Sequence, residues 1–152
     1  MSLTKKYEGY SSFSYLEAGK DYKSFDLADE LTRVPPYTLP LSEEDETRVR
    51  SLIDASLLVS MHEHVGVFPD KIQETPEYAR HGRMHTAFKG LAASHWDCVF
   101  DNLMDGICHI HSSSGWQWDD VLHDLGMRLC DLAHQDFVLH CQRIGDVQRA
   151  HD

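Results

Sequence analysis

Residues 57–64 read Leu-Leu-Val-Ser-Met-His-Glu-His, an apolar run that ends in two histidines separated by one residue. A short continuous apolar run is typical of a strand that is buried on both faces, as in a parallel sheet. Side chains alternate across a strand, so His62 and His64 point to one side and Glu63 to the other. In a barrel of parallel strands, chemistry takes place at the C-terminal ends of the strands, and neutral imidazole is the commonest metal ligand. The run therefore predicts two ligands of a metal-dependent hydrolase.

A helix is expected directly before this strand. Ser42 is a favourable N-cap, and three acidic residues follow it in the first turn, where the helix dipole favours negative charge. Val49, Leu52 and Ile53 are spaced for one buried face, and the helix should end near Ala55 or Ser56.

Residues 1–41 form a separate segment, which we interpret as an extended N-terminal arm. Prolines at 35, 36 and 40 exclude a helix there and favour extended chain. The aromatic side chains spread through the arm could anchor it along its own domain or a neighbouring subunit; they are Tyr7, Tyr10, Phe13, Tyr15, Tyr22, Phe25 and Tyr37.

Further elements are expected downstream. The pattern predicts a short helix over 70–80 that Pro76 interrupts, a second strand within 90–100, and an apolar segment at 107–111 between loops. The clearest helix is expected from about Asp119 to Leu139, because apolar residues repeat there at three- and four-residue steps. A last short helix is expected over 145–151.

Composition excludes some partners. The chain has 152 residues, 41% of them hydrophobic and 26% charged, so it can bury a core. Its 14 basic and 25 acidic residues give a formal net charge of -11, which repels nucleic acid and anionic membrane surfaces. No signal peptide or membrane span is recognisable, so we expect a cytoplasmic protein. The four cysteines form no C-x-x-C pair and are expected to be reduced and mostly buried.

Several longer motifs resemble the N-terminal third of the membrane (renal) dipeptidase family, within the amidohydrolase-like metal hydrolases. The resemblance extends from Tyr7 to Asp152, nearly the whole chain. The stretches that carry it are residues 33–37 (Arg-Val-Pro-Pro-Tyr), 60–64 with Phe68 and Pro69, 99–106 (Val-Phe-Asp-Asn-Leu-Met-Asp-Gly), and 123–131 with 133–136. The resemblance implies a (β/α)₈ TIM-type barrel with a binuclear, usually zinc, site that cleaves C–N bonds of small amides such as dipeptides.

The resemblance also assigns roles to the histidine pair. His62 matches the histidine of the family's H-x-D metal pair on the first strand, and His64 stands in place of its aspartate. A neutral ligand thus replaces an anionic one, which leaves the identity and number of the metal ions open. One or two ions, expected to be zinc, would lower the pKa of a bound water and polarise the scissile carbonyl, so that hydroxide attacks at neutral pH.

Other polar residues are weaker candidates. His109 and His111 form a second H-x-H pair that could add metal ligands, or they could be ordinary loop residues. Asp101 and Asn102 follow the second strand, where barrel loops contact substrate, but a helix cap and turn need the same residue types. Charged residues of the 119–139 helix, such as Asp124 and Arg128, are expected to form surface pairs.

A barrel needs roughly 250 residues, so residues 42–152 are interpreted as its first β/α units. We therefore expect a small subunit or segment of a hydrolase, active only in a hetero-oligomer with a larger chain that supplies the remaining strands and metal ligands. Two alternatives stay open: a non-catalytic structural subunit of a hydrolase assembly, and a free-standing small metal-binding domain that uses both H-x-H pairs.

Overall fold

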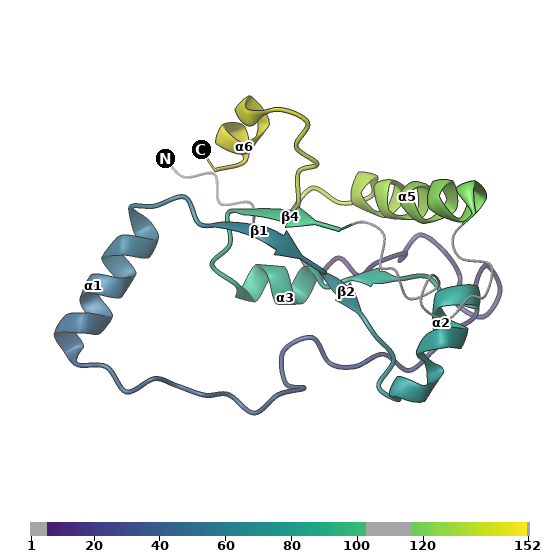
Figure 1. The fold of residues 1–152 in the computed structure, drawn as a ribbon, viewed down its shortest axis with the longest axis horizontal. Helices are drawn as coiled ribbons and strands as arrows, with labels where there is room; N and C mark the ends of the chain where they lie inside the picture. The colour runs from purple at the N-terminus through teal and green to yellow at the C-terminus, as the bar shows by residue number, and fades with distance from the viewer. Residues whose placement is uncertain (1–5, 103–116, 152) are drawn as a thin grey trace.

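The computed structural model describes residues 6–102 and 117–151, which form a mixed α/β arrangement with two small sheets (Figure 1). The elements are α1 (Glu43–Asp54), β1 (Val59–Glu63), β2 (Gly66–Val67), the 3-10 helix η1 (Ile72–Glu74), α2 (Thr75–His81), β3 (His85–Thr86), α3 (Phe88–Ala93), β4 (Cys98–Asp101), α5 (Trp118–Ala133) and α6 (Ile144–His151). Within these ranges, every helix is too short or too polar to cross a bilayer.

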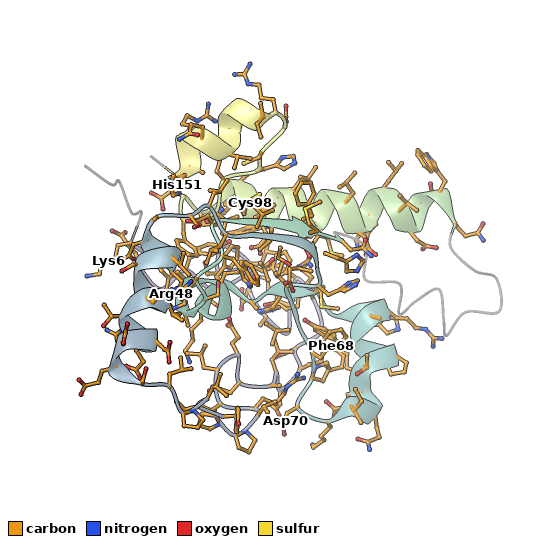
Figure 2. All side chains as sticks on the ribbon, turned by 60° about the vertical axis from the view of Figure 1, so that its left-hand side comes forward. Lys6, Arg48, Phe68, Asp70, Cys98 and His151 are labelled. Carbon is orange, nitrogen blue, oxygen red and sulfur yellow. The ribbon has the colours of Figure 1, made fainter. Side chains whose placement is uncertain are left out.

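The strand that carries His62 pairs in parallel with β4, and the connection between them contains β2, α2, β3 and α3. Val59 lies opposite Cys98, but the register shifts after Ser60, so that Glu63 lies opposite Asp101. The short strands β2 and β3 form an antiparallel pair. In both views α6 and α3 lie on opposite sides of the β1–β4 sheet (Figures 1 and 2). The α/β class predicted from the sequence is therefore confirmed.

The buried core surrounds the β2–β3 pair and not the β1–β4 sheet. Its hydrophobic members are Phe13, Val67, Tyr78 and Phe88. The arm contributes directly to this core: the Tyr10 ring packs edge-on against Phe88 with 5.2 Å between centroids. Part of the arm therefore packs on its own domain.

Two burial predictions are wrong. β1 is not buried on both faces, because Met61 is 72% exposed, and α1 has no buried residue although Leu52 was expected to face a core. Figure 1 shows α1 apart from the other elements, at the end of the extended last part of the arm. Apolar periodicity places such residues on one face of an element, but it does not supply a neighbour that covers the face.

Helix boundaries follow local signals more closely than strand boundaries. The Ser42 hydroxyl caps α1 by accepting from the Asp45 backbone N–H at 3.1 Å, as expected. Pro76 lies in the first turn of α2, where its missing N–H costs nothing, so it starts this helix and does not interrupt it. The expected strand within 90–100 is wrong over most of its length, because α3 precedes a strand that begins only at Cys98.

The last two helices also differ in part from the prediction. α5 ends at Ala133 and not near Leu139, because the Gln135 side-chain amide donates to the carbonyl of Leu132 at 2.7 Å and closes the helix end. α6 is confirmed within one residue, and His151 near its end lies 3.4 Å from a carboxylate oxygen of Asp97, beside Cys98 (Figure 2). The three cysteines in the described ranges are free, and none is fully buried.

Candidate metal site

His62 and His64 bring their ring nitrogens together at the carboxyl end of β1. His62 belongs to the strand, His64 follows its last residue, and their Nε2 atoms lie 2.9 Å apart. The rings meet edge to face, with centroids 4.9 Å apart and planes at 63°. Both side chains are exposed to solvent. Alternation along the strand accounts for this arrangement, because it sends residues 62 and 64 to the same side.

The chemistry of this pair fits a divalent metal ion. Two imidazole nitrogens bound tetrahedrally to zinc at about 2.0–2.1 Å lie about 3.3 Å apart, so the pair needs to open by only a few tenths of an ångström. At this distance one Nε2–H donates to the other nitrogen, whereas a bound metal ion would take both lone pairs. The described residues contain no group of three or more metal-ligating side chains that could hold an ion. Within residues 6–102 and 117–151, His62 and His64 are therefore two candidate ligands without a third.

Asp101 lies beside the histidine pair and connects three parts of the fold. One carboxylate oxygen accepts from the backbone N–H of Val65, the residue after His64, at 3.1 Å. The other lies 3.5 Å from the guanidinium of Arg128 on α5. Both side chains of this ion pair are nearly buried, 12% exposed for Asp101 and 5% for Arg128. Asp101 therefore fixes the backbone that carries His64.

The other predicted site residues have different environments. Asn102 donates its backbone N–H to the carbonyl of Glu63 at 3.0 Å, and it lines a cavity together with His64. Glu63 accepts a hydrogen bond from the Ser60 hydroxyl. The second pair, His109 and His111, lies outside the described residues. The structure therefore brings together His62, His64, Asp101 and Asn102.

Arg128 was missed as a member of this site, because the sequence interpretation placed it on the surface. Its guanidinium donates to the Thr86 hydroxyl at 3.0 Å and, more weakly, to the carbonyl of Met84 at 3.5 Å. One signal was present in the sequence: Arg128 lies seven residues after Val121 and three after Leu125, within the apolar stripe of the helix. A charged residue inside such a stripe must find a buried partner.

A cavity of about 250 Å³ opens next to the histidine pair. The described residues that line it are His64, Gly66, Phe68, Met84, Asn102 and Arg128. The candidate site thus consists of two exposed imidazoles, a buried ion pair behind them and a small cavity at their side.

Comparisons with protein-family models, with curated proteins and with solved structures find no match for this chain.

Proposed function

We propose that this chain supplies two metal ligands, His62 and His64, to a hydrolase that cleaves amide or other C–N bonds of small, dipeptide-like substrates. The observation that carries the proposal is the 2.9 Å approach of the two Nε2 atoms at the carboxyl end of a parallel strand. In a (β/α)₈ barrel this is the end of the strand at which the active site lies. The same geometry agrees with the family resemblance of residues 60–64.

In the proposed mechanism, residues of this chain bind the metal ion and hold its ligands in position. His62 and His64 donate Nε2 lone pairs, and Asp101 and Arg128 hold the peptide after His64 in place from behind. Such outer-shell partners fix the orientation of ligands and raise metal affinity. One or two zinc ions, when bound, would lower the pKa of water and polarise the amide carbonyl.

We further propose that a larger partner chain completes the barrel and the set of ligands. Parallel sheets are normally buried on both faces, and a two-stranded sheet is not stable by itself. Here Met61 on β1 and Phe100 on β4 are 72% and 56% exposed, and within the described ranges these two strands pair only with each other. Additional strands would cover this apolar surface and bring in the missing ligands.

Zinc titration of the full chain tests the metal proposal. We expect His62→Ala and His64→Ala each to weaken Zn²⁺ binding by about tenfold or more, because each removes one of only two described ligands. The matched control is His123→Ala, which removes an exposed histidine of α5 and should leave the affinity unchanged. Isothermal titration calorimetry gives the affinities, and ¹⁵N spectra of the imidazoles show whether Nε2 or Nδ1 binds.

The metal proposal fails if the three variants bind zinc equally well, or if only His123→Ala weakens zinc binding.

A non-catalytic structural subunit is the second candidate, favoured by the absence of a third ligand among the described residues. In an assembly isolated with its partner chain, His62→Ala should abolish amide hydrolysis. Unchanged activity of that assembly would instead assign a structural role to this chain.

A further inference from the structure

The cavity beside His64 is a half-open hollow that neither the metal proposal nor the fold requires. Its volume of about 250 Å³ lies just below that of typical small-molecule sites, so it can admit a group of about the size of one amino-acid side chain. Phe68 and Met84 give it apolar walls, while His64 belongs both to the cavity and to the histidine pair. A molecule bound at the pair can therefore extend a neighbouring group into this cavity.

Gly66 lines the cavity and lies against the Met84 side chain. A Cβ atom at this position would lie 2.9 Å from the sulfur of Met84, which is closer than a Cβ atom tolerates, and 3.4 Å from its Cγ. The Met84 side chain can approach the backbone of β2 only because residue 66 has no side chain. Any larger residue at 66 must displace the flexible thioether.

Arg128 lines the cavity, and its positive charge is already paired with the Asp101 carboxylate. Its guanidinium bonds to the Thr86 hydroxyl at 3.0 Å and faces the Asp101 carboxylate at 3.5 Å. A carboxylate entering the cavity would compete with Asp101 for this cation, in a chain of formal net charge -11. The cavity therefore suits a neutral group.

We propose that this cavity is a specificity pocket for a neutral, apolar side chain of leucine size, next to the amide bond held at the histidine pair. The role of this cavity as a substrate pocket rests on the proposed hydrolase function. Binding of the apolar group itself requires neither metal nor partner chain. It follows that the preferred substrates are small amides with an aliphatic side chain beside the scissile bond.

The test uses the full chain with ¹³C-labelled methionine methyl groups, titrated in the presence of EDTA so that no metal contributes. The probes are N-acetyl-L-leucinamide, N-acetylglycinamide and N-acetyl-L-leucine. We expect the leucinamide to shift the Met84 methyl resonance while leaving that of the exposed Met61 in place. The glycinamide, which lacks the isobutyl group, should bind about tenfold or more weakly.

Gly66→Ala should weaken the leucinamide-induced shift of Met84, because the added methyl group displaces the thioether that lines the cavity. Gly126→Ala is the matched control, since a Cβ there meets nothing within 4 Å. The comparison of probes on the unmodified chain does not depend on either variant folding.

Equal shifts with leucinamide and glycinamide, or no shift of Met84, would overturn the pocket. Tighter binding of N-acetyl-L-leucine than of its amide would overturn its neutral character and assign Arg128 as an anion site. Because the titration is free of metal, a failure here leaves the zinc result untouched, and a failure of zinc binding leaves the pocket intact.

Discussion

Several polar side chains of this chain occupy buried positions, where apolar side chains would be expected. Arg128 and Asp131 are 4% and 0% exposed, while Leu122 on the same helix is 51% exposed. The buried groups serve as partners for polar atoms of other segments, because an unpaired donor inside a protein costs more than the bond that satisfies it. Asp101 and Asp131 both act in this way.

His85 provides a prediction at the scale of one residue. Its ring packs edge-on against Phe13 with centroids 5.4 Å apart, and burial lowers the pKa of His85 below its ordinary value of 6.5. The unfolded chain therefore takes up a proton below about pH 6.5 that the folded chain resists, so the free energy of unfolding falls as the pH drops through this range. Above about pH 6.5, His85 is neutral in both states and no longer lowers the free energy of unfolding.

His85→Phe keeps an aromatic ring at this position and removes the titration. We expect the difference in the free energy of unfolding between pH 7.5 and pH 5.5, measured by urea denaturation, to be smaller in this variant than in the unmodified chain. His123→Phe, at an exposed position, should retain the original difference. A pH dependence that both variants preserve would show that His85 does not contribute.

At the scale of elements, one carboxylate attaches the N-terminal arm to α5. Asp131 accepts from the Tyr10 hydroxyl at 2.7 Å and from the backbone N–H of Phe13 at 2.9 Å. Burial, and then the hydrogen bond to Asp131, raise the pKa of Tyr10 well above its ordinary value, so the phenol stays a proton donor. Phe13 has a φ of 58°, an unfavourable conformation for a bulky residue that these contacts stabilise.

Asp131→Ala should therefore detach this part of the arm. It leaves two donors without their acceptor, and we expect a loss of about 2–4 kcal/mol in the free energy of unfolding. Hydrogen exchange of the Phe13 amide should become much faster, which identifies the arm as the affected segment. Asp136→Ala, at an exposed aspartate just beyond the helix, is the control and should change neither measurement. An unchanged Phe13 amide in Asp131→Ala would refute this role of the carboxylate.

At the scale of the whole molecule, apolar surface is left uncovered at the β1–β4 sheet and along α1. Met61, Phe100 and Leu52 are each more than half exposed. Exposed apolar patches of this kind indicate an interface, and unpaired strand edges tend to associate when no partner covers them. This arrangement motivates the partner chain in the proposed function.

We expect the isolated chain to self-associate, and Met61→Lys to suppress this association, because a lysine on the sheet face opposes stacking and edge pairing. Sedimentation velocity over a range of protein concentrations gives the measurement. Gln73→Lys adds the same charge at an exposed polar site in η1 and should leave the association unchanged. A chain that stays monomeric at all concentrations would contradict the prediction.

Local sequence determined the features that depend on a few neighbouring residues. Ser42 with its acidic turn defines the start of α1, and strand alternation places His62 and His64 on one side. These features could be predicted because capping and alternation act over two to four residues. The histidine pair is the part of the candidate site that the sequence alone identified as candidate metal ligands.

Only the tertiary structure decided which faces of the elements are covered and which residues join distant segments. Arg128 reaches Asp101 across 27 positions of the chain and Asp131 reaches Phe13 across 118, pairings that no local pattern specifies. The sequence placed Arg128 on the surface and β1 in the core, and the structure reverses both, because periodicity describes a face but not its neighbour. The cavity beside His64 likewise exists only because β2, α5 and the residues next to β3 and β4 converge there.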